Sequence, residues 1–250
     1  MKITILGSGT STGVPYLNCG CEVCRSKDPH DARLRCSALV EYRGRTLLID
    51  CGPDFRQQML RRPTPQIDAV LFTHEHYDHV AGIDDLRPYG NVRLYAEERV
   101  CSAIRRNLPY CFAETHYPGA PRLELHTIDL KPFTAAGIEI QPIRCYHAQL
   151  PIVGYRIGPM AYLTDISRID DDQLPLLDGL EVLIIDALRQ TPHFSHYMLT
   201  EAQALATRLG VRRCYFTHIC HQMGLHAAVN STLPEGQALC YDGMEIQLGD

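Results

Sequence analysis

Ala69-Val70-Leu71-Phe72 is followed directly by Thr73-His74-Glu75-His76-Tyr77-Asp78-His79, so four potential metal ligands come straight after an apolar run. In an extended chain alternate residues face the same way, and His74, His76 and Asp78 can therefore converge on one side. We expect His79 to turn in at the start of the next element. Imidazole and carboxylate together suit Zn, Mn or Fe. The run therefore predicts a metal site at the end of a buried strand.

Four ligands in one loop cannot all reach one ion, so we expect them to be divided between two ions that take further ligands from elsewhere. Three candidates each follow an apolar run: His147, Asp165 and His218. A polar side chain just past the end of a strand is positioned by a rigid scaffold. Each of the three alone is equally well explained as a hydrogen-bonded core histidine or a turn aspartate. Their joint placement favours the metal site.

A second cluster lies near the start of the chain, in Asn18-Cys19-Gly20-Cys21-Glu22-Val23-Cys24. Three cysteines cannot all pair with one another as disulfides, and their tight spacing suits a zinc site that lacks one ligand. The candidates for the fourth ligand are His221, Cys220 and the other cysteines. The alternative interpretation is a loop with three free thiols. The scattered cysteines are expected to be buried thiols, as is usual in a cytosolic chain.

Short β-rich runs recur along the chain, and helical patterns lie between some of them. The expected strands are residues 3–6, 38–42, 46–49, 69–72, 92–95, 123–128, 138–143, 153–157, 160–163, 182–185, 214–216 and 244–248. The expected helices lie near 54–61, 97–106, 170–177 and 200–209. For the last helix, Thr200 and Gln203 form a capping-box pattern and Gly210 marks the end. This order predicts mixed sheets with helices packed outside, an α/β or α+β layered domain.

Composition indicates an ordinary globular protein. The 250 residues are 45% hydrophobic and 21% charged, without a repeat or linker, which predicts a single domain over residues 1–250. The net charge of −5 offers no basic field, so a nucleic-acid partner is not expected. The first apolar run is too short for a signal peptide, and no apolar stretch approaches the roughly 20 residues of a membrane span. We therefore expect a soluble cytoplasmic protein without a membrane partner.

The order of the candidate ligands resembles the signature of the metallo-β-lactamase superfamily: His74-x-His76-x-Asp78-His79, then His147, Asp165 and His218. The resemblance covers essentially the whole chain and implies an αββα sandwich with two metals at one edge. It assigns the first metal to His74, His76 and His147. It assigns the second metal to Asp78, His79 and His218, with Asp165 as the bridge. His76 favours hydrolysis, because flavodiiron oxidoreductases of this superfamily usually carry an acidic residue there.

Within the superfamily, the chain most resembles the phosphodiesterase family of the carbon–phosphorus lyase pathway. The shared runs are Gly7-Ser8-Gly9-Thr10 with Gly13-Val14-Pro15, then Thr217-His218-Ile219-Cys220-His221, and Asp242-Gly243-Met244-Glu245-Ile246. That family has a structural zinc on a Cys-x-Cys-x-x-Cys cluster plus a histidine. The matching residues here are Cys19, Cys21, Cys24 and His221. Cys220 departs from the expected serine and remains a rival to His221. The relative also suggests a homodimer.

The resemblance implies a metal-dependent hydrolase of phosphoric diesters. The expected substrates are small cyclic or activated phosphodiesters, including a cyclic ribose phosphate. The expected cofactors are two catalytic divalent ions (Zn or Mn, or alternatively Fe) and one structural Zn. The catalytic residues would be Asp78 and His196, because in relatives a histidine at the position of His196 protonates the leaving group. His193, three residues earlier, is the alternative acid, and either histidine could instead be an ordinary surface residue.

Three other functions remain open at this point. A 3′-tRNA processing endonuclease, tRNase Z-like, shares the fold, metals and reaction type, but it would need an RNA-binding surface that this composition does not offer. A thioester hydrolase of the same fold shares the metal ligands, but the cysteine cluster has no counterpart there. A metal-binding module without catalytic activity is the third alternative.

Overall fold

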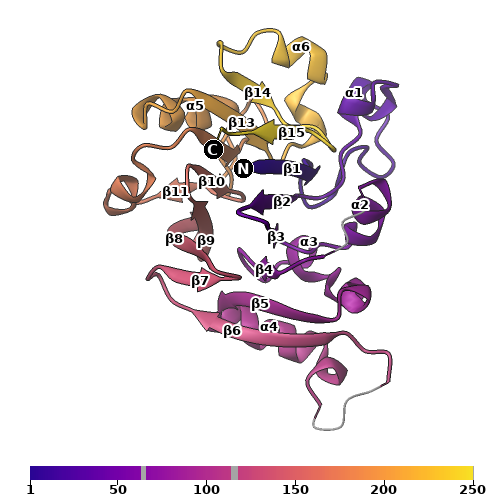
Figure 1. Cartoon of the computed structure of the whole chain (residues 1–250). Helices are drawn as coiled ribbons and strands as arrows, with labels where there is room; N and C mark the ends of the chain where they lie inside the picture. The colour runs from indigo at the N-terminus through magenta and orange to yellow at the C-terminus, as the bar shows by residue number, and fades with distance from the viewer. Residues whose placement is uncertain (63–65, 114–117, 250) are drawn as a thin grey trace.

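Two β-sheets face one another in the structure, a computed structural model that describes residues 1–62, 66–113 and 118–249 (Figure 1). The first sheet has the strand order β15-β1-β2-β3-β4-β5-β6. Its strands are β1 (Lys2–Gly7), β2 (Ser37–Tyr42), β3 (Arg45–Ile49), β4 (Ala69–Leu71), β5 (Asn91–Glu97), β6 (Arg122–Ile128) and β15 (Glu245–Gln247). Strands β3, β4, β5 and β6 are parallel, whereas β15, β1, β2 and β3 pair antiparallel. The loop that follows β4 carries His74 and His76.

The second sheet has the order β11-β8-β9-β10-β12-β13-β14, and β7 pairs with β8. Its strands are β7 (Phe133–Ala135), β8 (Ile138–His147), β9 (Leu150–Ile157), β10 (Met160–Leu163), β11 (Arg168–Ile169), β12 (Val182–Asp186), β13 (Arg213–Thr217) and β14 (Gln237–Leu239). Strands β10, β12, β13 and β14 run parallel, so their carboxyl ends meet at one edge of the sheet. Residues that follow these strands are therefore brought together.

Helices cover the outer faces of both sheets. The helices are α1 (Glu22–Arg25), α2 (Phe55–Arg61), α3 (Tyr77–Val80), α4 (Glu98–Asn107), α5 (Leu199–Arg208) and α6 (His226–Asn230). The 3-10 turns are η1 (Pro29–Asp31), η2 (Ile83–Tyr89), η3 (Pro109–Cys111), η4 (Asp171–Leu177) and η5 (His221–Met223). One buried apolar cluster joins the inner faces of the two sheets. A second packs α5 on the second sheet, and a third packs α2 and α4 on the first. These layers confirm the predicted αββα sandwich.

The last predicted helix is present, but its predicted cap is wrong. Helix α5 begins at Leu199, and the backbone N–H of Met198 donates to the Glu201 carboxylate at 2.8 Å. Thr200 therefore lies inside the first turn, because the capping pair is Met198 and Glu201, two residues earlier than the predicted pair Thr200 and Gln203. Gly210, at φ +64°, follows the helix as expected. The helix predicted near 170–177 is the 3-10 turn η4, which contains Pro175, a residue without a backbone donor.

Each of the predicted strands is present. The prediction missed three short strands and misplaced the ends of several others. The predicted strand 138–143 is longer in the structure. Strand β8 runs on to His147, so this histidine is the last residue of the strand. Strands β7, β11 and β14 were not predicted, because two or three residues carry too little periodicity to be recognised. The scattered cysteines are buried as expected, except Cys220, which is half-buried.

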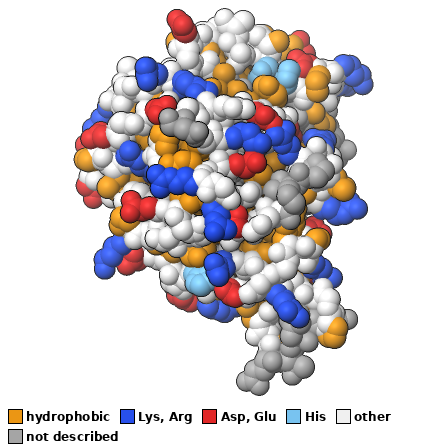
Figure 2. All heavy atoms as spheres, in the orientation of Figure 1, with side chains coloured by type: hydrophobic (Ala, Val, Ile, Leu, Met, Phe, Trp, Pro, Cys, Tyr) orange, Lys and Arg blue, Asp and Glu red, His pale blue; other side chains and the backbone are white. Residues whose placement is uncertain are grey.

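Two observations bear on the expected partners. No helix in residues 1–62, 66–113 or 118–249 is long and apolar enough to cross a bilayer. On the face that Figure 2 shows, Lys and Arg side chains alternate with Asp and Glu side chains and do not form one basic surface. This face therefore resembles a mixed solvated surface.

Candidate metal centre

The predicted ligands of the second metal lie together. The ligand atoms of Asp78, His79, Asp165 and His218 are all within 4.8 Å of one another, and all four side chains are buried. The Nε2 atom of His79 lies 3.1 Å from Asp165 Oδ2, and the Nε2 atom of His218 lies 3.1 Å from Asp165 Oδ1. The two oxygens of one carboxylate thus face two imidazoles. Helix α3 supplies Asp78 and His79, and the loops after β10 and β13 supply Asp165 and His218.

The predicted ligands of the first metal gather beside this group. The ring centroids of His74 and His76 are 4.5 Å apart, and those of His76 and His147 are 5.2 Å apart. The His74 ring is also 4.2 Å from the His79 ring, so the two ligand sets adjoin. Asp165 belongs to a second compact group with His147 and His196. The aspartate expected to bridge the metals therefore lies between the two sets.

Unpaired buried atoms show that the residues fit metal ions. Asp78 Oδ2 and the Nε2 atoms of His74, His79 and His218 are buried and make no well-formed hydrogen bond within the described residues, although the His79 and His218 atoms lie 3.1 Å from Asp165. Buried polar atoms normally have a partner, and a shared cation would supply one. A convergent set of imidazoles and carboxylates is the donor chemistry of Zn, Mn or Fe.

The electrostatics of the group also favour a cation. Burial alone would lower the pKa of His79, but the carboxylates of Asp78, Asp165 and Asp50 raise it well above its usual value. Burial would raise the pKa of Asp165, but His218 and His79 hold it well below its usual range. The group therefore favours the ionised carboxylates of Asp78 and Asp165, which stabilise positive charge where ions would bind.

Hydrogen bonds on the far side of each ring orient the histidines. His79 Nδ1 lies 2.7 Å from Asp50 Oδ2, and His147 Nδ1 lies 2.9 Å from the Ser195 carbonyl oxygen. His74 Nδ1 lies 3.0 Å from Thr73 Oγ1. With Nδ1 occupied in this way, Nε2 is left to face the centre, which is the usual arrangement around bound metals.

Asp50 is a residue of this site that the sequence reasoning missed. Besides His79 it accepts hydrogen bonds from the Thr73 backbone N–H and hydroxyl, both at 2.9 Å. It directly follows the buried strand β3, which is the same signal that singled out Asp165 and His218. Asp50, Asp165 and His218 also share a left-handed backbone, at φ 59°, 57° and 58°. Such strain in non-glycine residues clusters at functional sites.

A close backbone approach fixes helix α3, which carries Asp78. A Cβ atom at Gly52 would lie 1.9 Å from the Asp78 carbonyl oxygen, and one at Gly82 would lie 2.0 Å from the Gly52 carbonyl oxygen. Only glycine permits these contacts. The loop after β3 therefore packs directly against α3 and holds its ligands in place.

An arginine connects the loop of His74 and His76 to the hairpin of His147. Arg99, in α4, forms an ion pair with Glu75, the residue between the two histidines. Its Nη2 atom also donates to the Pro151 carbonyl oxygen at 2.6 Å. Pro151 lies opposite Tyr146 in the β8–β9 pair, next to His147. Arg99 thus holds the two parts of the first ligand set in register.

His196 lies at the centre, beside both ligand sets. Its ring centroid is 4.6 Å from that of His147 and 4.7 Å from that of His218. His196 Nδ1 lies 2.9 Å from Asp186 Oδ2, and both side chains are buried. Burial lowers the pKa of His196 and raises that of Asp186. Asp186, the last residue of β12, is a second orienting carboxylate that the sequence reasoning missed.

His193 lies farther out than His196. Its ring centroid is 5.2 Å from that of His196, and it is half-buried. Its Nδ1 atom lies 3.2 Å from Ser195 Oγ, a contact within its own loop. The structure therefore brings His196, and not His193, against the ligand rings.

The predicted zinc cluster forms a separate group at the other side of His218. The ligand atoms of Cys19, Cys21, Cys24 and His221 all lie within 4.8 Å of one another. The Sγ atoms of Cys19 and Cys21 are each 3.4 Å from His221 Nδ1. Figure 1 shows α1 beside the C-terminal elements, which is how residues so far apart in sequence meet.

Cys220, the rival fourth ligand, is not part of this group. Its Sγ atom accepts a hydrogen bond from the Gln222 backbone N–H at 3.4 Å instead. The contact with His221 lowers the pKa of the Cys21 thiol to about 6, whereas burial raises that of Cys24 to about 11. The contact with His221 therefore favours the thiolate form of Cys21, the form that binds metal.

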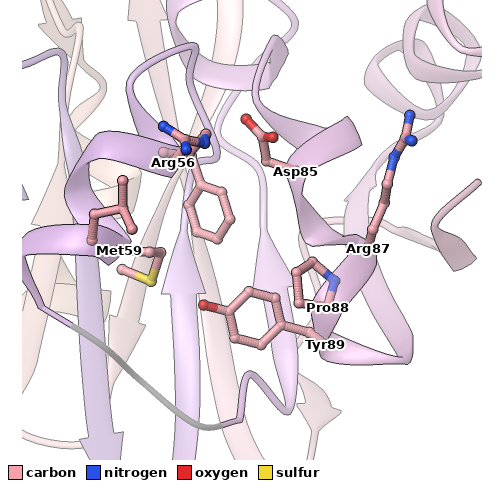
Figure 3. A pocket seen from close by; sticks show the side chains of 8 residues that line it. Arg56, Met59, Asp85, Arg87, Pro88 and Tyr89 are labelled. Carbon is pink, nitrogen blue, oxygen red and sulfur yellow. The ribbon is translucent and has the colours of Figure 1, made fainter.

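A cavity of about 400 Å³ lies elsewhere, between α2 and η2 (Figure 3). Arg56 and Met59 line it from α2, and Asp85, Arg87 and Tyr89 line it from η2. None of the predicted ligands, and neither His193 nor His196, is among its lining residues. Its position gives it no part in the chemistry described above.

Comparison with known proteins agrees with this geometry. The family model for the beta-lactamase superfamily domain matches residues 45–219. A crystal structure of a diphosphatase from the PhnP family superimposes with a TM-score of 0.92 at 40% identity, over 99% of this chain and 98% of that one. Human tRNase Z, short form, superimposes with a TM-score of 0.72 at 19% identity, over 100% of both chains, which shows the shared fold.

One curated relative is considerably longer than this chain. The octanoyltransferase of Porphyromonas gingivalis (strain ATCC BAA-308 / W83) is 42% identical over 98% of this chain. The chain spans 51% of that protein's length, so the name describes a protein of which the match covers about half.

Proposed function

Because the chain belongs to the metallo-β-lactamase superfamily and is a metal-dependent hydrolase of that fold, we propose that it hydrolyses phosphodiester bonds in small cyclic or activated substrates. One observation carries the proposal. Two adjoining groups of histidines lie on either side of Asp165, and the Nε2 atoms of His74, His79 and His218 among them are buried without a well-formed hydrogen bond. That is the arrangement by which two-metal sites hold a phosphoryl group. The PhnP-family diphosphatase, at 40% identity over the full chain, supports phosphoryl chemistry in particular.

We propose the ligand assignment that the family resemblance implied. His74, His76 and His147 would hold one ion. Asp78, His79 and His218 would hold the other, with Asp165 shared between them. Two divalent ions there would supply a nucleophilic water at neutral pH and would neutralise charge on the phosphoryl oxygens. Asp50, Thr73 and the Ser195 carbonyl would keep the histidine rings in the geometry that this requires.

His196 would protonate the leaving oxygen. An alkoxide is a poor leaving group, so a proton donor beside it contributes strongly to the rate. Asp186 holds Nδ1 of His196 and leaves Nε2 for the substrate. Burial opposes the charged form of His196, but the negative charge of a bound phosphodiester favours the imidazolium. His196 would therefore become protonated when the substrate binds.

The cysteine cluster would hold a structural zinc through Cys19, Cys21, Cys24 and His221. Helix α1 has four residues and none of them is buried, so its own packing contributes little to its order. A zinc site can supply folding energy to such a segment. We also propose that residues 1–250 act as one domain, since both sheets contribute to one shared core.

The reaction class is tested by a substrate comparison. Purified protein is stripped of metal, reloaded with Zn or Mn, and assayed with bis(p-nitrophenyl) phosphate and with an S-acyl glutathione thioester. We expect metal-dependent hydrolysis of the phosphodiester, and the Asp165→Asn variant should be inactive. Preferential thioester hydrolysis would contradict the proposal, as would phosphodiester hydrolysis that does not depend on added metal. Cleavage of a tRNA precursor in preference to small esters would identify the endonuclease alternative.

A further inference from the structure

Phe194 is a large apolar side chain that the fold leaves almost entirely in water. It is 82% exposed, and it stands on the loop between β12 and α5, two residues before His196. A scattered exposed hydrophobic residue needs no explanation by itself. In Phe194 the exposure coincides with a position at the edge of the candidate centre.

A line of rings connects Phe194 to that centre. The Phe194 ring centroid is 4.8 Å from that of His193, and the His193 centroid is 5.2 Å from that of His196. His196 in turn contacts the rings of both ligand sets. A substrate with its leaving oxygen at His196 would extend its leaving group along this line. Phe194 follows the two histidines in this series of ring contacts.

The loop that presents Phe194 is held in place. Arg189 Nη2 donates to the Pro192 carbonyl oxygen at 2.8 Å, and its Nε donates to the Thr191 carbonyl oxygen at 3.2 Å. Its Nη1 donates to Gln222 Oε1 at 2.6 Å, next to the cysteine cluster. The Ser195 backbone N–H and hydroxyl both contact His193 Nδ1. A ring on an anchored loop loses little freedom when a ligand packs on it, which favours binding.

We propose that Phe194 is a stacking platform for a planar heteroaromatic ring in the leaving group, so that the substrate class is a phosphodiester carrying a nucleobase. The proposal rests on the proposed function, because it places the phosphoryl group at the metal centre. A ribose phosphate without a base offers no flat face for the ring, whereas every nucleobase does. The Arg189 guanidinium on the same loop adds positive charge beside the anionic substrate.

The test compares two substrates with the same reacting ring. One is 2′,3′-cyclic AMP, and the other is methyl riboside 2,3-cyclic phosphate, which lacks the base. Phe194→Ala should raise KM for the nucleotide roughly 5- to 100-fold with little change in kcat, since base–aromatic stacking is of that size by alanine substitution. The effect on the base-free substrate should be much smaller. Phe194→Tyr, which keeps the ring, should restore most of the loss.

A matched control and a binding measurement complete the experiment. Leu60→Ala removes a 66% exposed apolar side chain from α2, away from the centre, and should leave both substrates unaffected. Titration of adenosine 3′-monophosphate, a product analogue, should show the same loss of affinity in Phe194→Ala, and the same recovery in Phe194→Tyr.

The outcomes separate the two proposals. If the protein hydrolyses phosphodiesters but Phe194→Ala affects both substrates equally, or neither, the stacking platform is wrong and the proposed function stands. If no phosphodiester is hydrolysed, yet Phe194→Ala weakens binding of the adenosine monophosphate, the platform stands and the proposed function fails. If the wild-type protein does not bind the monophosphate, the platform is overturned.

Discussion

The candidate metal centre and the cysteine cluster are neighbours in the chain, since His218 belongs to the first and His221 to the second. They differ in how the protein holds their candidate ligands. At the centre His74, His79, Asp165 and His218 are between 0% and 2% exposed, whereas His147 is half-buried and His76 is exposed. Asp50 and Thr73 hold the rings of His79 and His74. In the cluster all three cysteines are half-exposed, and the one that lies on a helix, Cys24, is on α1, which has no buried residues. The fold therefore positions the first set of ligands, whereas a bound ion would have to position the second. The two regions should respond differently to the loss of a ligand.

Asp165→Asn should have the largest effect on turnover and little effect on folding. Asparagine keeps the shape of the side chain and tolerates the left-handed backbone at this position, but it removes the charge shared by the two imidazoles. We expect hydrolysis to fall to the background rate, with reduced metal at the centre and a wild-type circular dichroism spectrum. Retained activity would show that Asp165 is not shared between two ions.

His196→Ala should have the next largest effect, and one that depends on the leaving group. A p-nitrophenolate leaves without a proton, whereas a ribose alkoxide does not, and general acid catalysis is typically worth about 10²–10⁴-fold. We expect a loss in that range with a 2′,3′-cyclic nucleotide, a clearly smaller loss with bis(p-nitrophenyl) phosphate, and unchanged bound metal. His193→Ala should do much less on either substrate.

Two outcomes of that experiment would change the assignment. Equal losses on both substrates would mean that His196 binds the phosphoryl oxygens or supports the metals, in keeping with its closeness to His147 and Asp165. A large loss in His193→Ala, with His196→Ala near wild type, would make His193 the acid.

Asp50→Asn should weaken metal binding at the buried centre by about 10–100-fold, the usual size for a partner that orients a metal ligand. The amide keeps the shape of Asp50 but replaces the negative charge that faces His79 Nδ1. Titration of the metal-free protein with zinc, followed by a competing chelator, measures the affinity. An unchanged affinity would mean that burial alone fixes the His79 ring. Zinc at the cysteine cluster should be unaffected in either case.

Arg99→Ala should have a smaller effect, up to about 10-fold on metal affinity, the low end for such orienting contacts. It removes the link between Glu75 and Pro151 without touching a ligand. Arg93→Ala is the matched control, since Arg93 forms a surface ion pair with Glu124 on the neighbouring strand β6. Equal, small effects of both changes would show that Arg99 has no particular role at the first ligand set.

The sequence singled out the candidate ligands, which the structure brings together, but it did not single out the residues that hold their rings. His74, His76 and Asp78 are recognisable because they alternate after a buried strand, and His147, Asp165 and His218 because each comes at or just after the end of an apolar run. Asp50 directly follows the buried strand β3, and Asp186 is the last residue of the buried strand β12. From the sequence alone, an aspartate at either position is equally well explained as a turn residue. Their role depends on a histidine 29 or 10 residues away, a pairing that spacing alone does not specify.

The fold, too, was predicted in part. The short β-rich runs predicted most of the strands correctly, and the layers agree with the expected sandwich. The short helices α1, α3 and α6 were not predicted, because four or five residues do not complete a recognisable helical period. Two of them carry ligands. Helix α3 packs buried side chains, and α1 carries Cys24 of the cysteine cluster. Contacts of this kind join residues far apart in the chain, so the local sequence does not predict them.

Elemental analysis of three proteins, purified in parallel without chelators, tests the central claim most directly. We predict up to three ions per chain in the wild type, of which one is zinc that resists mild chelation. Asp165→Asn should lose metal from the centre, keep that zinc and keep its melting temperature. Cys21→Ser should lose the resistant zinc and melt at a lower temperature. A wild-type protein with an intact fold and no tightly held zinc would contradict the account, as would a Cys21→Ser protein with unchanged zinc and unchanged stability.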